Sequence, residues 1–428
     1  MNRVCRLALC WLLFVPGFAA TRSAWAGQPS TNSEAEAQIA YYRKRIGGPG
    51  TYPAYARLGL AYVQLARESG TASYYREAVR FLRQSLDYQR NFEALWGMAV
   101  ALSQQHYFRE ALDYAQEAAA AMPSNPEAQG VLFDIRLALG DVGEAKAVGI
   151  ALLEGQPGFH AFTRLAALRE YQGNHPGAVE AMLKARDAAA ADALPATARA
   201  WAEVRLGSLF VADCNASAAL EAYHRALAIA PGYFLAIEHL AEWHAGHGHW
   251  EKAGSLYREL LKTRPEPQYR FALAEVLRHE GKAKAANREA AKALRELRRA
   301  AQSGAQDVFR PLALCLLESG NSVAEGLRWA RRDWEVRHDA LAADTLAWAC
   351  FRTGRYDEAL SLSGAALDSG TKHPAVLLHA GSIRFHLAKV AEGRALIKQT
   401  LACPWAMGPL ERTLAKQVQA ELSRNIED

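Results

Sequence analysis

The 428-residue sequence predicts an all-α fold, a right-handed superhelical solenoid of stacked helix–turn–helix units. The main observation is a recurring spacing. A small residue is followed by Ala twelve positions later, by Ala or Leu after seven more, and often by Pro after another five. Successive units lie 34 residues apart in several places, and a fixed period in this range is typical of helical repeat proteins. The spacing occurs at Ala99, Ala111, Ala118 and Pro123, at Gly207, Ala219, Ala226 and Pro231, and at Ala241, Ala253, Leu260 and Pro265.

Composition and turn residues also favour helices. Ala, Leu, Glu, Arg and Lys are abundant and runs of β-branched residues are scarce, which favours helix over strand. A Gly followed by a polar residue marks the turn inside a unit, because Gly ends one helix and the polar residue begins the next. Pro closes a unit, because it lacks the N–H donor of a continuing helix. The turns are Gly140-Asp141, Gly173-Asn174, Gly248-His249, Gly281-Lys282 and Gly354-Arg355, and the closing prolines are Pro123, Pro157, Pro231 and Pro265.

Residues 1–26 have the pattern of a secretory signal peptide. Arg3 and Arg6 give a basic start, and residues 7–20 are uncharged and mostly apolar. Ala24 and Ala26 suit a signal peptidase that would leave Gly27 first. A membrane anchor is the alternative, but about 20 apolar residues are needed to span a bilayer and this run is shorter. We therefore expect an exported protein, periplasmic, secreted or associated with the cell surface, with no stable membrane span after cleavage.

The same patterns divide the chain into segments. They predict a signal peptide at 1–26, a lead-in segment at 27–51, an N-terminal array at 52–195, a C-terminal array at 196–404 and a capping helix at 405–428. The cap is expected because four apolar residues at helical spacing can cover the last exposed face of a solenoid. These residues are Leu410, Leu414, Val418 and Leu422.

Two units depart from the pattern. The first carries seven extra residues between Gly59 and Ala78, which predicts a longer turn there. In the third unit Phe133 stands where a small residue is expected. Because two helices approach closely only where small side chains meet, we expect a looser helix crossing in that unit.

Charge and cysteine content exclude several classes of protein. Removing the three arginines of residues 1–26 leaves 47 basic against 45 acidic residues, too balanced for a nucleic-acid-binding surface. Four cysteines remain in the mature chain, at Cys214, Cys315, Cys350 and Cys403. We expect no disulfide framework, because a chain of this length buries enough apolar surface without one. A single bridge between Cys315 and Cys350 is the alternative to buried, inert thiols.

The repeated spacing resembles the tetratricopeptide repeat. The resemblance rests on Leu206-Gly207, Ala219-Leu220, Tyr223, Ala226-Leu227 and Pro231, and on the run from Gly354 to Leu360. Ten such units cover about residues 52–404. The resemblance implies a superhelix whose first helices line a concave groove, and a protein or peptide segment as the partner in that groove. It implies no particular partner, because one fold serves many functions.

The groove prediction names one row of residues on the first helices. The row lies three before, one after and four after the small residue of each unit, a spacing that puts its members on one helical face. Large aromatic residues on an exposed row would mark a contact surface, whereas the alternative is that they pack against neighbouring helices. The row holds Trp96, Glu238, Glu242, Phe271, Glu275, Arg278, Asp344, Trp348, Phe351 and Phe385.

The sequence contains no pattern that points to catalysis or to a cofactor. We find no nucleophile elbow, zinc-protease motif, phosphate-binding loop or dinucleotide fingerprint, so we expect a protein that is not an enzyme. The segment from His239 to His249 is rich in histidine, but His239 and His244 are about 500° apart around a helix, so no metal site is expected. A protein-interaction scaffold is the predicted function. The alternatives are an accessory factor in cell-envelope assembly (secretion, polysaccharide export or cytochrome maturation) and, less favoured, a metal-handling protein that uses these histidines.

Overall fold

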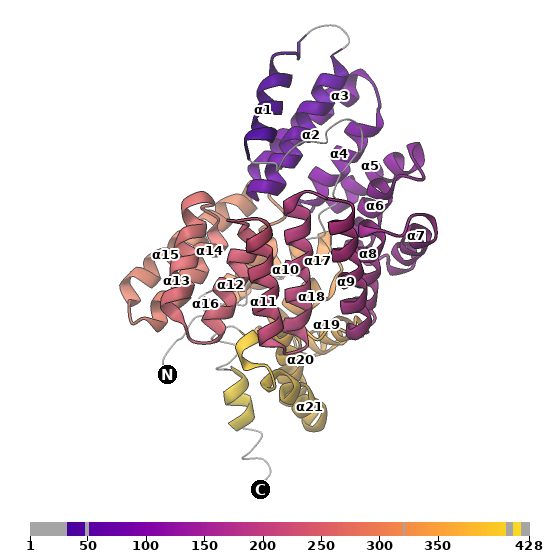
Figure 1. Ribbon diagram of the computed structural model, residues 1–428. Coiled ribbons are helices and arrows are strands. Elements are labelled where there is room, and N and C mark those ends of the chain that lie inside the picture. Colours follow the sequence, from indigo (N-terminus) through magenta and orange to yellow (C-terminus); the bar gives the residue numbers. More distant parts are fainter. Residues whose placement is uncertain (1–31, 48–50, 320–321, 408–413, 421–428) are drawn as a thin grey trace.

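The structure is a computed structural model that describes residues 32–47, 51–319, 322–407 and 414–420 (Figure 1). The predicted signal peptide, Leu410 and Leu422 lie outside these residues. Every regular element within them is a helix. The all-α fold class predicted from the sequence is therefore confirmed.

Ten helix pairs follow a first helix, α1 (Asn32–Arg43), and precede a short 3-10 helix, η1 (Pro404–Ala406). In chain order the units are α2 (Tyr52–Ser69) with α3 (Ser73–Tyr88), α4 (Phe92–Ser103) with α5 (Phe108–Ala121), α6 (Pro126–Leu139) with α7 (Val142–Gly155), α8 (Phe159–Tyr171) with α9 (His175–Ala191), α10 (Ala196–Ala212) with α11 (Ala216–Ile229), α12 (Phe234–Gly246) with α13 (Trp250–Thr263), α14 (Pro267–His279) with α15 (Ala283–Gln302), α16 (Phe309–Ser319) with α17 (Val323–Val336), α18 (Ala340–Arg352) with α19 (Tyr356–Asp368), and α20 (Pro374–His386) with α21 (Val390–Leu401).

We call the two helices of a unit A and B, the connection between them the A–B turn, and the connection to the next unit the inter-unit linker. Each A helix packs against its own B helix, and several pack against the next A helix, as α2 does on α4 and α18 on α20. The A helices therefore form the inner layer of the superhelix and the B helices the outer layer. This is the stacking of a tetratricopeptide-like solenoid.

Small residues permit the close helix crossings. A Cβ added to Gly207 of α10 would collide with the ring of Tyr223 on α11, and Ala219 is fully buried in the same interface. The looser crossing expected at Phe133 agrees with the structure, in which α6 and α7 contact each other less extensively than the two helices of any other unit. Phe133 is fully buried, and Gly149 on α7 supplies the missing space, since a Cβ there would lie 3.2 Å from the Phe133 ring.

The first unit differs from its prediction. Its extra residues mostly lengthen helix α2, which runs to Ser69, whereas the turn that follows begins with Gly70 in a left-handed conformation. Leu65 and Ala66 are buried in the added helical turn, and burying them favours more helix over a longer loop.

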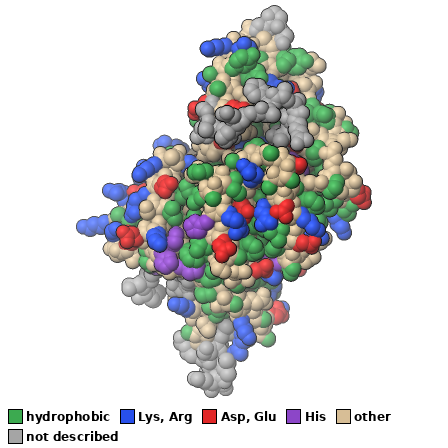
Figure 2. All heavy atoms as spheres, in the orientation of Figure 1, with side chains coloured by type: hydrophobic (Ala, Val, Ile, Leu, Met, Phe, Trp, Pro, Cys, Tyr) green, Lys and Arg blue, Asp and Glu red, His purple; other side chains and the backbone are tan. Residues whose placement is uncertain are grey.

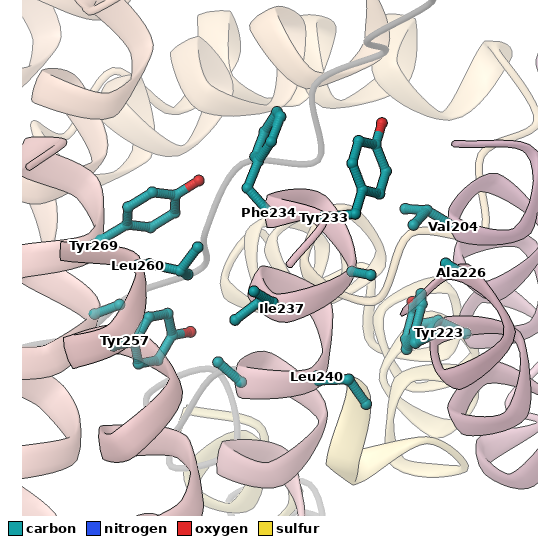
Figure 3. Packing of buried hydrophobic residues seen from close by; sticks show 14 of the residues in the cluster. Val204, Tyr223, Ala226, Tyr233, Phe234, Ile237, Leu240, Tyr257, Leu260 and Tyr269 are labelled. Carbon is teal, nitrogen blue, oxygen red and sulfur yellow. The ribbon is translucent and has the colours of Figure 1, made fainter. Parts of the chain in front are cut away.

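A continuous apolar core crosses the middle of the chain. One cluster extends from Phe159 to Leu316 and so spans the boundary predicted between 195 and 196. Figure 3 shows Ile237 and Leu240 of α12 between Tyr223 of α11 and Tyr257 of α13. The division into two arrays remains a prediction. At the C-terminus, Val418 contacts the cluster around Ile397 of α21, so the described part of the predicted cap covers the last unit.

The superhelix closes on itself through a regular series of contacts that we call the seam. The A–B turns of units one, two and four and the last turns of the A helices of units three and five meet the segments that follow units six to ten. The partners are 194, 197 and 192 residues apart at three of these contacts. In chain order the seam joins Gly70 with Arg264, Tyr107 with Gly304, Ala138 with His338, Gly173 with Gly370, and Val211 with Cys403.

Backbone groups form much of the seam. The Tyr107 hydroxyl donates to the Gly304 carbonyl over 2.8 Å, and the His338 N–H donates to the Ala138 carbonyl over 2.9 Å. The Arg264 guanidinium donates to the Gly70 carbonyl and stacks 3.5 Å from the centre of the Phe234 ring. In Figure 1 the yellow helices α20 and α21 accordingly lie beneath α10 to α12, far from them in sequence.

Replacing Ala219 tests the helix register. We expect Ala219→Phe to lower the free energy of unfolding by about 1–3 kcal/mol, because a buried position with no spare volume must accept a ring. Ser217→Phe, at an exposed position of the same helix, is the control and should change little. Urea unfolding of the full chain measures both, and equal stability of the two variants would contradict this register.

Replacing Gly370 tests the seam. Gly370 (φ 68°) and Gly354 (φ 79°) are both left-handed, so Ala at either position costs about 1–2 kcal/mol. Only at Gly370 would the added Cβ collide with the backbone across the seam, at Gly173, whereas at Gly354 it meets nothing. We expect Gly370→Ala to destabilise the protein by at least about 1 kcal/mol more than Gly354→Ala. Equal melting temperatures for the two variants would show that the seam does not hold in solution.

Candidate functional site

The row predicted to line an exposed groove is in large part buried. Five of its residues are at most 6% exposed: Trp96, Phe271, Glu275, Asp344 and Trp348. The other five, Glu238, Glu242, Arg278, Phe351 and Phe385, are partly exposed. The expectation of an open row is therefore wrong at these five positions, because neighbouring helices cover them, as His379 of α20 covers Trp348 of α18. Their burial does not test the predicted role in binding a partner, which stays a prediction.

The acidic residues of the row have partners within the protein. The Tyr269 hydroxyl donates to the Glu238 carboxylate over 2.9 Å, and Glu275 pairs with Arg278. The His239 ring lies 2.8 Å from the Glu242 carboxylate. Burial, together with the nearby charge of Glu242, raises the pKa of Glu238 to about 7. The acidic side chains of the row are thus neutralised by partners inside the superhelix. Little net charge remains there that could attract a charged ligand.

Aromatic residues of the row contact further rings nearer the surface and form a partly exposed cluster with them. Trp348 stacks on His379 of α20, with ring centres 4.3 Å apart, and on Phe351, at 5.3 Å. The Phe351 ring in turn lies 5.9 Å from Tyr356 and 5.3 Å from His386. We call Trp348, Phe351, Tyr356 and His386 the edge cluster.

The edge cluster lies beside the A–B turns of units nine and ten, and its outer members face solvent. Tyr356 is 38% exposed and His386 is exposed. Phe385 is adjacent in sequence to His386 and is partly buried against the cluster around Ile397. Exposed aromatic residues that cluster in this way are typical of contact surfaces.

The seam explains why this edge is open. An added Cβ would meet the next superhelical turn within 4 Å at Gly70, Gly140 and Gly173, in the turns of units one, three and four. At Gly281 and Gly354, in the turns of units seven and nine, it would meet nothing. Among the described residues, the A–B turns of units seven and nine thus present the surface that the early turns use to bind the chain itself.

A second feature is a pocket at the seam between units three to five and units nine and ten. The space measures about 910 Å³, including the part open to solvent, and Leu137, Val211 and Leu341 form part of its apolar wall. Two ion pairs lie at its polar side, Glu170 with Arg205 at 2.8 Å and Asp213 with Lys372 at 3.4 Å. A ligand here would need both an apolar group and hydrogen-bonding groups.

His175 is the most buried polar group that lines this pocket. Its side chain is 1% exposed, and Nδ1 lies 3.9 Å from the Asp213 carboxylate. Burial lowers the pKa of His175. The imidazole is therefore mainly neutral at pH 7, so one ring nitrogen can donate a hydrogen bond and the other can accept one.

The histidine-rich segment forms a surface patch around the A–B turn of unit six, shown in purple in Figure 2. His247 stacks between Trp243 and Trp405, at 3.7 and 5.3 Å from their ring centres, and His244 Nδ1 lies 3.2 Å from His249 Nδ1. Within the residues that the structure describes, no three His, Cys, Asp or Glu side chains converge as metal ligands would. The described arrangement is a stacked aromatic contact with the C-terminal segment.

Comparisons with known proteins give similarity at the level of helical repeats. No protein-family model matches the chain, and no curated protein matches it. It is similar to the crystal structure of PilW, a type IV pilus biogenesis factor, with 17% identity and a TM-score of 0.39 over 47% of this chain and 91% of that one. It is also similar to yeast Tom70, with 11% identity and a TM-score of 0.33 over 88% and 99% of the two chains. Neither likeness assigns a function.

Sequence reasoning missed the seam pocket and the outer half of the edge cluster. Tyr356 belongs to a recognisable repeat motif, but nothing in the motif indicates that its ring meets His386 of the next unit. The pocket joins residues from units three and nine, so no local spacing could reveal it. For membrane association, none of the helices in the described residues combines the length and apolar character needed for a bilayer span.

A buried histidine at the seam predicts a dependence of stability on pH. His106 is 7% exposed, and burial, followed by the charge of Arg337, lowers its pKa from 6.5 to about 3. Below pH 6.5 the unfolded chain therefore binds a proton that the folded chain does not, so stability is lost as the pH falls towards 3. One such group contributes up to about 1.4 kcal/mol per pH unit.

We expect His106→Asn to flatten this dependence between pH 6 and 4. Asn removes the titrating ring and tolerates the left-handed backbone, where His106 has φ 63°. Denaturant unfolding of both proteins at several pH values gives the two slopes. Parallel curves would mean that His106 is accessible to protons in the folded state.

Proposed function

We propose that this protein is a non-enzymatic scaffold that binds a segment of a partner protein through the edge cluster. The observation that carries the proposal is the partly exposed group of aromatic side chains beside the A–B turn of unit nine, where a Cβ added to Gly354 would meet no described atom within 4 Å. The equivalent turns of the first units bind backbone segments of the same chain, which supports a polypeptide as the ligand. Apolar side chains of the partner would pack on Phe351 and Tyr356.

The predicted groove residues have two roles in this proposal. Phe351 and Phe385 contribute apolar surface near the binding edge, and Trp348 supports Phe351 from beneath by stacking. The Asp344 carboxylate lies 3.0 Å from His379 Nδ1 and so holds the ring on which Trp348 stacks. Trp96, Glu238, Glu242, Phe271, Glu275 and Arg278 then shape the interior and position neighbouring helices.

We further propose that the protein acts after export. The signal-peptide pattern of residues 1–26 supports a periplasmic, secreted or surface location. In that location an accessory role in cell-envelope assembly is the second candidate function, and the partner would be a component of the assembled machinery. Both candidates require the same kind of binding surface.

The edge cluster is tested by removing two of its rings. We expect the double variant Phe351→Ala and Tyr356→Ala to bind the partner at least tenfold more weakly, because truncating buried aromatic anchors costs about 2 kcal/mol or more. Cross-linked pull-downs from envelope extract, quantified by mass spectrometry, identify the partner with the wild-type protein. Titration of that purified partner then gives the dissociation constants.

Tyr88→Ala is the matched control. Tyr88 is 61% exposed and lies on α3, so its loss removes an exposed ring without touching the edge cluster. Circular dichroism of every variant establishes that the fold is intact. If the double variant binds the partner as tightly as Tyr88→Ala does, the contact surface is elsewhere.

A further inference from the structure

Two cysteines distant in sequence meet at the last contact of the seam. Cys214 lies in the A–B turn of unit five, and Cys403 lies between α21 and η1. The Cys403 thiol donates to the Val211 carbonyl over 3.6 Å, and the same oxygen accepts from the Cys214 N–H over 3.0 Å. The shared carbonyl holds the two residues side by side.

The backbone conformation at position 214 favours glycine and gives no reason for a cysteine there. Cys214 has φ 59°, a left-handed conformation that costs a residue with a side chain about 1–2 kcal/mol. Most described A–B turns place glycine at this position, with His106 and Ala388 as the other exceptions. Strained positions of this kind often carry a functional side chain.

The two thiols differ in access. Cys214 is exposed, whereas Cys403 is 1% exposed. Burial and then a hydrogen bond with Cys214 raise the pKa of the Cys403 thiol. An external reagent can therefore reach Cys214 first, and Cys403 is in position to react with Cys214 only.

We propose that Cys214 and Cys403 form a disulfide that locks the C-terminal end of the superhelix onto unit five. The oxidant is a disulfide, either of an envelope thiol oxidoreductase or of oxidised glutathione. The Cys214 thiolate attacks it, which forms a mixed disulfide and releases one thiol. The Cys403 thiolate then attacks the Cys214 sulfur, so the Cys214–Cys403 bond forms and the second thiol leaves. The two protein thiols lose two electrons and two protons, and the oxidant gains them.

The lock would act where the seam ends. Around it the C-terminal segment is held by the Lys372–Asp213 ion pair and by the contact of Trp405 with Gly246. A covalent bond would join residues 189 positions apart and so restrict the unfolded chain over nearly half its length. This inference stands independently of the proposed partner surface, because it concerns contacts within the chain.

Peptide mapping under non-reducing conditions tests the bond. Purified full-length mature protein is incubated with oxidised glutathione, and alkylated digests are analysed by mass spectrometry. We expect a peptide pair linked through Cys214 and Cys403, lost on reduction, with Cys315 and Cys350 alkylated. A stable glutathione adduct on Cys214, or a linkage between any other pair, would overturn the proposal.

The locking effect is measured as a shift in melting temperature. We expect the oxidised protein to melt several degrees above the reduced protein, and Cys214→Gly to abolish this difference. Gly suits the left-handed turn, so this variant should fold. Cys315→Ser is the control and should retain the shift. A linked protein that melts at the same temperature as the reduced one would show that the bond forms without locking the seam.

Discussion

The stacking of one superhelical turn on the next is the constraint on which the other features depend. A solenoid whose units touch only their neighbours can change its curvature at low cost, since each interface yields a little. Here the Arg264 guanidinium, the Tyr107 hydroxyl and the His338 amide tie early turns to late linkers. These contacts hold each early unit against a late one. They also require small or left-handed residues where two backbones meet, as at Gly173 and Gly370.

Burial of much of the inner row changes where binding can occur. Charged groups inside the superhelix must find partners there, since an unpaired charge is costly in a dry environment. Arg164 pairs with Asp134 and Arg337 with Asp339, and each arginine is at most 2% exposed. The inner face therefore serves stability, and the partner surface that we propose lies instead on the open edge beside unit nine. Closure and the proposed binding thus occupy different parts of one repeated structure.

The helices and turns, which depend on nearby residues, could be predicted from the sequence. The seam and the exposure of the inner row, which depend on the geometry of many units together, could not. The spacing located the helices, and the glycine turns at Gly140, Gly173 and Gly354 are all left-handed as a helix end requires. The row on the A helices was assigned to a common face, but its exposure depends on how far each unit rotates. Each unit is rotated slightly relative to the one before it, and the total rotation over six units decides whether Gly70 reaches Arg264. No single repeat motif determines that total rotation. Only the early and late halves together define the seam pocket.

The seam also joins residues that are synthesised at very different times. Arg264 follows Gly70 by 194 residues, so the first A–B turn is synthesised long before its covering group. At about 5–20 residues per second, this interval is roughly 10–40 s. During it the turns of the early units resemble the open edge of the late ones and can bind other polypeptides. A growing chain therefore completes the environment of its first unit only when the sixth unit has emerged, and a chain truncated before residue 403 leaves the turn of unit five without its last contact.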